Sequence, residues 1–195
     1  MERISVFCGS SPGKDGLYEK AARQLGEILA ERKIGLVYGG TNIGLMNHVA
    51  NGALSRGGEV IGVLPEFIGK KGIAHPDLTQ LIIVNSMHER KRKMHELSDG
   101  VIAMPGGFGT LEEFFEVLTW GQLGLHKKPV GLLNINGFYD PLRILTHKMV
   151  TEGFLKEENR KMLLISDEIT ELLDLMENYT APSVEKWISR ENNIT

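Results

Sequence analysis

The fold of this chain follows from residues 36–64, whose sequence is LVYGGTNIGLMNHVANGALSRGGEVIGVL. An apolar, β-forming run at 36–38 leads through the glycine loop at 39–44 into a helical pattern over 45–56, and a second apolar run follows at 60–64. Apolar strands that alternate with helices are typical of parallel strands joined by right-handed crossovers. This stretch therefore predicts one βαβ unit of an α/β protein.

The same alternation extends over most of the chain. Further strands are predicted at residues 4–8, 81–84, 101–104, 130–133 and 163–165, and further helices at 18–29, at 87–97, from about 111, from about 141 and at 168–176. This order predicts a Rossmann-like, doubly wound parallel sheet with helices on both faces. Because no repeat or linker divides the sequence, we expect one domain over residues 1–195, with a peripheral tail at 178–195.

Composition excludes several classes of protein. The chain has 195 residues, of which 42% are hydrophobic and 24% charged, with a net charge of -3, as in an ordinary soluble globular protein. No apolar run approaches the ~20 residues of a membrane helix, and residues 1–11 have the pattern of a first strand rather than of a signal peptide. A single cysteine forms no intrachain disulfide. We therefore expect a cytoplasmic protein with neither a membrane nor a nucleic acid as partner.

Glycine is the residue in excess. The chain contains 23 glycines, against about 14 at the average usage of ~7%. Three glycine loops each lead from a predicted strand into a helix: CGSSPG (8–13), GGTNIG (39–44) and PGGFGT (105–110). Glycine lets backbone N–H groups approach an anion at a helix N-terminus, and doubly wound sheets bind ligands beyond the carboxyl ends of their strands. We predict a phosphate pocket, although each loop taken singly is also compatible with a mere tight turn.

The known nucleotide fingerprints are absent from these loops. None places Lys and then Ser or Thr after its last glycine, as a Walker loop requires, and none has the GxGxxG spacing of dinucleotide-binding proteins. ATP hydrolysis and NAD chemistry are therefore disfavoured. A mononucleotide or a sugar phosphate remains as the predicted ligand.

The segment MHERKRKM (87–94) is a charge run on a predicted helix. A helical wheel places Arg90 and Lys91 on its apolar face and turns Arg92 and Lys93 away from that face. A charge held toward the interior needs a partner, because desolvating it alone costs several kcal/mol. We favour a bound anion as this partner, and a structural carboxylate is the alternative.

Two adjacent glutamates, Glu112 and Glu113, follow the third glycine loop. Thr110 and Glu113 have the spacing of a capping box, which would give Glu113 a purely structural role. A carboxylate beside a phosphate loop also suits cleavage of a glycosidic bond, because the oxocarbenium-like transition state needs nearby negative charge or a base for water. Glu112 shares a different face of this helix with Glu116 and Thr119. The spacing leaves open which of the two adjacent glutamates acts.

The remaining reactive residue types give weaker signals. Cys8 ends the first predicted strand without an activating base, so we expect a small buried hydrophobic residue. The six histidines lack metal-ligand spacing, and His88 and His95 are expected at the surface. We predict no metal and no cofactor.

Three segments, GGTNIGLMN (39–47), MHERKRKM (87–94) and PGGFGTLEE (105–113), resemble the signatures GGxxGLM, MHxRKxxM and PGGxGTxxE of the "lonely guy" (LOG) family. The resemblance extends from the first strand to about residue 180. It implies a phosphoribohydrolase of cytokinin biosynthesis or an AMP nucleosidase. Such an enzyme hydrolyses the N-glycosidic bond of a cytokinin riboside 5′-monophosphate or of AMP, giving the free base and ribose 5-phosphate.

The resemblance also implies roles for individual residues. Arg90 and Glu113 match the family's catalytic pair. The positions that match its substrate contacts are Lys91, Gly106, Gly107, Phe108, Gly109, Thr110, Leu111, Glu112 and Thr119. The family further implies a homodimer, for which an apolar helix over 114–125 is the expected interface. Where plant members carry an acid, this chain has Gly72, so the contact made there is expected to differ.

Two other interpretations compete with a hydrolase. Sequences of this kind have also been described as lysine decarboxylases, but no segment here is suited to holding pyridoxal phosphate. A non-catalytic protein that binds a nucleotide or a phosphorylated cofactor is the main alternative, because fold alone does not separate binding from catalysis. A DNA-processing relative of the fold is disfavoured by the net charge of -3.

Overall fold

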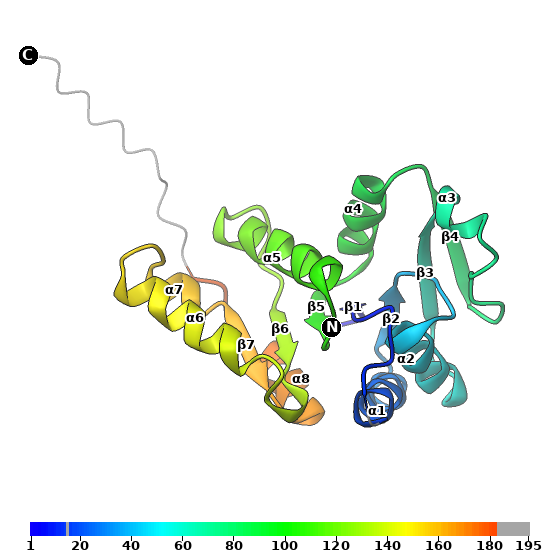
Figure 1. Ribbon diagram of the computed structural model, residues 1–195, viewed down its shortest axis with the longest axis horizontal. Coiled ribbons are helices and arrows are strands. Elements are labelled where there is room, and N and C mark those ends of the chain that lie inside the picture. The colour runs from blue at the N-terminus through cyan, green and yellow to red at the C-terminus, as the bar shows by residue number, and fades with distance from the viewer. Residues whose placement is uncertain (15, 183–195) are drawn as a thin grey trace, which may run out of the picture.

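A computed structural model describes residues 1–14 and 16–182 of the chain (Figure 1). Seven strands form one sheet: β1 (Arg3–Phe7), β2 (Gly35–Tyr38), β3 (Val60–Pro65), β4 (Gln80–Val84), β5 (Gly100–Ala103), β6 (Val130–Leu133) and β7 (Leu163–Ser166). Their order is β4-β3-β2-β1-β5-β6-β7, and every neighbouring pair is parallel. The predicted doubly wound sheet is confirmed, and its strand order reverses between β1 and β5.

Helices cover both faces of this sheet (Figure 1). The structure contains α1 (Leu17–Glu31), α2 (Gly44–Ser55), α3 (Glu66–Gly69), α4 (Met87–Leu97), α5 (Phe108–Gln122), the 3-10 helix η1 (Ile135–Gly137), α6 (Asp140–Thr151), α7 (Glu157–Arg160) and α8 (Ile169–Glu177). None of those drawn from the described residues is long and apolar enough to cross a membrane. The short helices α3, α7 and η1 lie in connections for which the sequence predicted no helix. The part of the predicted peripheral tail at 183–195 lies outside the described residues.

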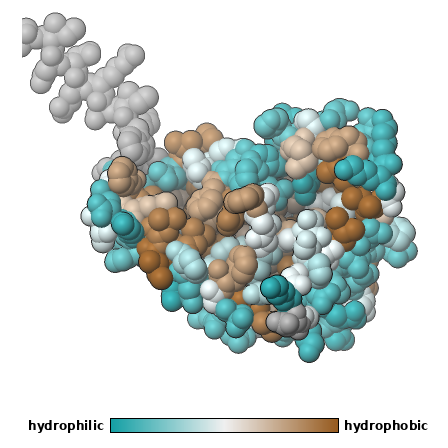
Figure 2. Space-filling view, in the orientation of Figure 1, coloured by the Kyte–Doolittle hydropathy of each residue, from teal (hydrophilic) through white to brown (hydrophobic). Residues whose placement is uncertain are grey.

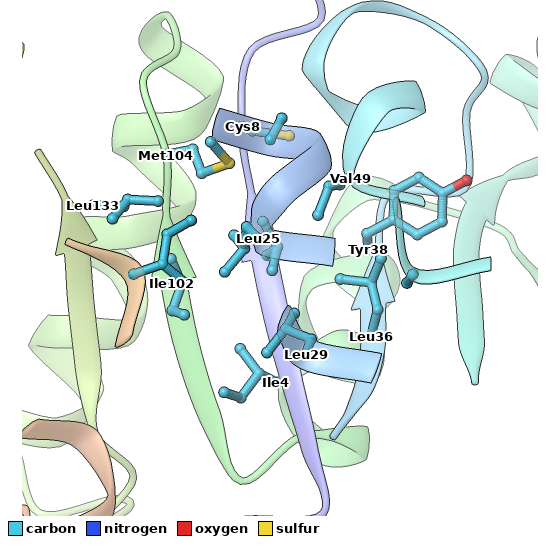
Figure 3. Packing of buried hydrophobic residues seen from close by; sticks show 14 of the residues in the cluster. Ile4, Cys8, Leu25, Leu29, Leu36, Tyr38, Val49, Ile102, Met104 and Leu133 are labelled. Carbon is cyan, nitrogen blue, oxygen red and sulfur yellow. The ribbon is translucent and has the colours of Figure 1, made fainter. Parts of the chain in front are cut away.

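Two apolar cores lie on opposite faces of the sheet. One packs α1, α2 and α8 against the strands, with Ile4, Leu36 and Ile102 fully buried between them (Figure 3). The other packs α4 and α5 against the opposite face, around Met94 and Phe114. Continuous burial along β1, β2, β3, β5 and β6 explains why these strands have apolar rather than alternating sequences.

Helices α1 and α2 approach each other unusually closely because glycines face each other across their contact. A Cβ atom at Gly26 would lie 2.1 Å from the Val49 carbonyl oxygen, and one at Gly52 would lie 2.1 Å from that of Arg23. Helix α1 follows the first glycine loop, and α2 begins at Gly44, the last residue of the second. Their close packing therefore fixes the two loops relative to each other.

Candidate active site

The three glycine loops meet at one edge of the sheet, as predicted. They follow β1, β2 and β5, which are adjacent strands. The backbone N–H of Gly9 donates to the Pro105 carbonyl (3.1 Å), and the N–H of Leu45 donates to the Gly9 carbonyl (3.0 Å). At Gly44, φ is +53° and a Cβ atom would lie 2.3 Å from the Ser10 carbonyl carbon. Glycine is thus required at Gly44 for the first and second loops to touch.

A pocket of about 340 Å³ opens between the first and third loops. It lies where the strand order reverses, which is the usual ligand crevice of a doubly wound sheet. The rings of Tyr18 and Phe138 border it, with centroids 6.1 Å apart. Its lining residues, which include no charged side chain, are Gly9, Ser10, Ser11, Gly13, Tyr18, Leu45, Pro105, Gly106, Gly107 and Phe138.

The N-terminus of α5 adjoins this pocket. Its N-cap, Gly107, supplies no side-chain cap, so the N–H groups of the first turn are available to an anion. A Cβ atom at Gly107 or Gly109 would meet nothing within 4 Å, whereas one at Gly106 would lie 2.2 Å from Thr110 Oγ1. Glycine is therefore needed for packing at Gly106 and leaves open space at Gly107 and Gly109.

The predicted capping box is wrong. α5 begins at Phe108, three residues before the predicted start, so Thr110 lies inside the helix instead of at its N-cap. The Glu113 carboxylate instead forms an ion pair with Arg90 on α4, with Oε1 3.1 Å from Nη1. Both side chains are nearly buried, with 11% of Arg90 and 9% of Glu113 exposed.

Lys91 has carboxylate partners as well. Its Nζ lies 2.5 Å from Glu112 Oε1 and 3.0 Å from Glu116 Oε1, which come from successive turns of α5. Arg92 is directed outward with 71% of its side chain exposed, as the helical wheel predicts. The carboxylate alternative is therefore confirmed as the partner of both inward cations. The Nε of Arg90 is buried without a hydrogen-bond partner among the described residues.

The structure separates the two adjacent glutamates. Glu112 is 57% exposed and is held by Lys91. Glu113 is buried, and desolvation raises its pKa above the ordinary value despite the opposing charge of Arg90. A buried carboxyl group with a raised pKa is a candidate for proton transfer, because its pKa lies nearer to neutral pH than that of an exposed carboxyl group. Glu113 rather than Glu112 therefore has the environment of a reacting group.

Cys8 lies close to this pair and is buried. Its side chain is 7% exposed at the end of the apolar core shown in Figure 3. Burial is the main cause that raises the pKa of the thiol, the Glu113 charge adds to it, and Arg90 opposes it. The predicted small buried hydrophobic residue is confirmed. The described part of the chain contains no group of three or more His, Cys, Asp or Glu side chains that could hold a metal ion.

The remaining predicted contacts are spread along α5. Phe108 is 94% exposed at its first turn, Thr110 is buried, and Leu111 is half-buried. Thr119 is exposed and lines a different cavity, of about 170 Å³, formed with residues of α6 and α7. The structure thus brings Gly106, Gly107 and their neighbours to the first pocket but not Thr119.

Sequence reasoning missed two aromatic residues that border the first pocket, Tyr18 and Phe138. Tyr18 was assigned only to the helical pattern of α1. Phe138 follows the carboxyl end of β6, where doubly wound sheets carry their ligand-binding loops. Its place just after a strand end was the signal that could have identified it.

Gly107 and Gly106 give a matched pair of variants. We expect Gly107→Ala to fold with a loss of stability below ~1 kcal/mol, because its Cβ enters open space. The same methyl group would occupy space beside the α5 N-terminus and raise KM for a phosphorylated ligand. Gly106→Ala is expected to lose about 1–3 kcal/mol of stability through overpacking. Thermal unfolding and steady-state kinetics measure both. An unchanged KM for Gly107→Ala would place the phosphate elsewhere.

His95 is not the surface residue that was predicted. It is half-buried between α4 and α5, with its ring centroid 5.4 Å from that of Trp120 and 4.7 Å from that of His126. Burial, helped by the charge of Lys128 and by His126, lowers the pKa of His95 to about 4. The neutral imidazole is therefore the form that the fold accommodates.

This environment predicts a loss of stability in acid. Below about pH 6.5 the unfolded chain binds a proton at His95, whereas the folded chain does so only near its lowered pKa of about 4. The free energy of unfolding should thus fall by roughly 1–2 kcal/mol over this interval, a value already reduced for solvent screening of a half-exposed ring. Urea unfolding across the interval measures the change. His95→Phe should reduce the change, whereas the exposed control His88→Gln should not; equal pH dependence in all three proteins would contradict the assignment.

Together, the sheet, the glycine loops and the Arg90–Glu113 pair define a Rossmann-type α/β protein with a candidate ligand pocket at its strand switch point. A family model described as "Possible lysine decarboxylase" matches residues 46–176. The chain is 47% identical over 182 residues to a probable cytokinin riboside 5′-monophosphate phosphoribohydrolase of Oryza sativa subsp. japonica, covering 93% of this chain and 74% of that protein. It therefore belongs to the LOG family.

A second relative agrees with this membership, and solved structures share the fold. A cytokinin riboside 5′-monophosphate phosphoribohydrolase of Rhodococcoides fascians is 47% identical over 167 residues, covering 85% of this chain and 84% of that enzyme. Among solved structures, the molybdenum cofactor binding protein of Rippkaea orientalis has a TM-score of 0.68 at 26% identity, covering 90% of this chain and 94% of that one. DNA processing protein A of Helicobacter pylori shares the fold alone, with a TM-score of 0.54 at 16% identity over 91% of this chain and 81% of that one.

Proposed function

We propose that this protein hydrolyses the N-glycosidic bond of a nucleoside 5′-monophosphate and releases the free base and ribose 5-phosphate. The substrate is a cytokinin riboside 5′-monophosphate or AMP. The observation that carries the proposal is the buried Glu113 carboxylate, held at 3.1 Å by Arg90, whose guanidinium group packs against Gly39 of the second glycine loop. Relatives at 47% identity that bear this activity in their names support it.

The phosphate group is bound by the third glycine loop. The uncapped first turn of α5 offers backbone N–H groups and the positive end of the helix dipole. Gly107 and Gly109 leave open space there for the phosphate oxygens. Because the pocket lining has no charged side chain, backbone groups and the hydroxyls of Ser10 and Ser11 supply the phosphate contacts.

Glu113 acts at the anomeric carbon. As the base departs, C1′ and the ring oxygen acquire positive charge, which a buried carboxylate stabilises. The same carboxylate accepts a proton from the attacking water, a transfer for which its raised pKa is suited. Water supplies the hydroxyl group at C1′, and the proton that Glu113 takes from this water balances the one gained by the leaving base.

Arg90 has donors left for the substrate. Nη1 holds Glu113, while the buried Nε has no partner among the described residues. An unpaired buried donor is costly, so an acceptor on the substrate would stabilise it. Lys91, fastened to Glu112 and Glu116, ties α4 to α5 and keeps Arg90 opposite Glu113.

A base-release assay tests the proposal. Purified protein is incubated with AMP, with N6-prenyl AMP and with adenosine, and the free base is separated by chromatography. We expect base release from the two monophosphates and little from adenosine, because the phosphate supplies the binding contacts. Equal release from adenosine would contradict the phosphate site. This chain has no acid at Gly72, where a Cβ atom would meet nothing within 4 Å. The ratio of the base-release rates from the two monophosphates therefore reports the base preference.

A second candidate function is non-catalytic binding of a phosphorylated cofactor. It is favoured by the similarity to the cofactor-binding protein of Rippkaea orientalis. Saturable binding of a phosphorylated ligand without release of base from either monophosphate would select this candidate.

The active unit is a homodimer that uses the face formed by α5, α6 and α7. Figure 2 shows apolar side chains gathered over these helices. The predicted interface over residues 114–125 needs revision, because Phe114 is fully buried in its own core and α5 ends at Gln122. The exposed apolar side chains on and beside these helices include Leu123, Leu125, Ile144 and Phe154. We expect a dimer mass by light scattering and a monomer for Ile144→Glu; an unchanged mass would exclude this face.

A further inference from the structure

His75 is buried although it lies in a loop, the connection between β3 and β4. Only 4% of the residue is exposed. Its Nδ1 accepts the backbone N–H of Asp77 (3.2 Å), and its Nε2 lies 3.3 Å from Asn51 Oδ1 on α2. Because Nδ1 is an acceptor, the neutral ring carries its proton on Nε2 and donates it to Asn51. Both ring nitrogens are therefore used to fasten the loop to α2.

The segment 73–75 lies along the second glycine loop. The N–H of His75 donates to the Gly40 carbonyl (3.0 Å), and the N–H of Asn42 donates to the Ile73 carbonyl (2.9 Å). Thr41 and Ala74 form an antiparallel bridge between these two bonds. The backbone of the second glycine loop is thus covered on this side by the segment that His75 holds.

The other side of the same loop contacts Arg90. A Cβ atom at Gly39 would lie 2.3 Å from Arg90 Nη2 and 3.0 Å from Met46 Sδ. The guanidinium group therefore packs directly against the Gly39 backbone. A displacement of this backbone toward or away from α4 changes the room available to Arg90, and with it the geometry of the pair with Glu113.

We propose that His75 is a positioning residue of the site: its neutral imidazole fastens segment 73–75 to α2 and thereby holds the second glycine loop against Arg90. The inference rests on the proposed function, because it assigns His75 to the reaction of Arg90 and Glu113. Within the part of the chain that the structure describes, His75 forms no hydrogen bond with Arg90 or Glu113.

Protonation of His75 would release this fastening. A proton on Nδ1 would face the N–H of Asp77, so two donors would oppose each other. Burial lowers the pKa of His75 below its ordinary value of 6.5, and the charge of Asp77 partly opposes that shift. Its other contacts, Asn51 on α2 and Gly40 in the glycine loop, are uncharged. The fastening is therefore complete at neutral pH and weakens in acid.

The test compares wild-type protein with His75→Ala and His75→Asn. The asparagine keeps an acceptor for the N–H of Asp77 but does not titrate. We expect His75→Ala to lower kcat/KM about tenfold or more, and His75→Asn to recover much of this loss. Below pH 6.5, kcat/KM of the wild type should fall more steeply than that of His75→Asn. The part of the pH dependence that comes from Glu113 should be the same in both proteins.

Cys8 supplies a readout that is independent of turnover. It is the only cysteine of the chain. It directly precedes Gly9, whose carbonyl accepts a hydrogen bond from the N–H of Leu45 on α2. We expect an aromatic disulfide reagent to label Cys8 faster in His75→Ala than in the wild type. Equal labelling with unchanged kcat/KM, or the same pH profile in His75→Asn and the wild type, would overturn the inference. If His75→Ala does not fold, the comparison of the pH profiles of the wild type and His75→Asn decides. If the wild type releases no base, the proposed function fails, while the labelling of Cys8 still tests whether His75 fastens the loop.

Discussion

Glu113→Gln should lower kcat for base release by about 10²- to 10⁴-fold, the range lost when a general acid–base group is removed. The amide keeps the size of the carboxylate and retains an oxygen that can accept from Arg90 Nη1. It cannot take a proton from water, and it carries no charge to stabilise C1′. Loss of the buried ion pair should also lower the melting temperature, so turnover is compared at a temperature where circular dichroism shows both proteins folded.

Glu112→Gln is the matched control for this variant. Glu112 is the preceding residue on the same helix, but it is 57% exposed and contacts Lys91, which keeps a second partner in Glu116. Its replacement should leave kcat within about tenfold of the wild type. A larger loss in Glu112→Gln than in Glu113→Gln would reverse the roles assigned to these two carboxylates.

Arg90→Lys should lower kcat/KM by about 10²- to 10³-fold, as expected when a preorganised donor to the reacting centre is lost. A lysine keeps the charge but replaces the planar fork with a single ammonium group, which cannot hold Glu113 and also present a second donor along the Nε direction. The buried Nε of Arg90, unpartnered among the described residues, is the donor that would be missing.

Arg92→Lys serves as the control on the same helix. Arg92 is 71% exposed and forms a surface ion pair with Glu96. The substitution should leave kcat/KM unchanged, because surface ion pairs contribute little. Wild-type kinetics in Arg90→Lys would show that charge alone suffices and that the fork geometry has no role.

The sequence predicted the sheet well because burial controls its strands. Val130–Leu133 and Met87–Leu97 were predicted with the bounds that the structure has, since apolar runs and helical periodicity are strong local signals. The start of α5 was misplaced because a glycine loop carries no side-chain cap that marks a helix start. The short helices α3 and α7 were missed because one turn has too few residues to show periodicity.

The candidate site was predicted in part. The helical wheel identified Arg90 and Lys91 as inward cations, because side-chain direction on a helix follows from spacing. Their carboxylate partners on α5 could not be derived from spacing, since the contact depends on how α4 and α5 pack on the sheet. The distinction between Glu112 and Glu113 depends likewise on burial. His75 gave no sequence signal at all, because its fastening joins a loop to a helix more than twenty residues away.

The central claim is that the Arg90–Glu113 site cleaves the glycosidic bond of a nucleoside 5′-monophosphate. Its most direct test follows AMP and N6-prenyl AMP with time and quantifies the free base and ribose 5-phosphate together, for the wild type and for Glu113→Gln. We predict equimolar amounts of the two products from the wild type and at least a hundredfold less from the variant. Binding of the monophosphates without either product, or undiminished release by folded Glu113→Gln, would contradict this account.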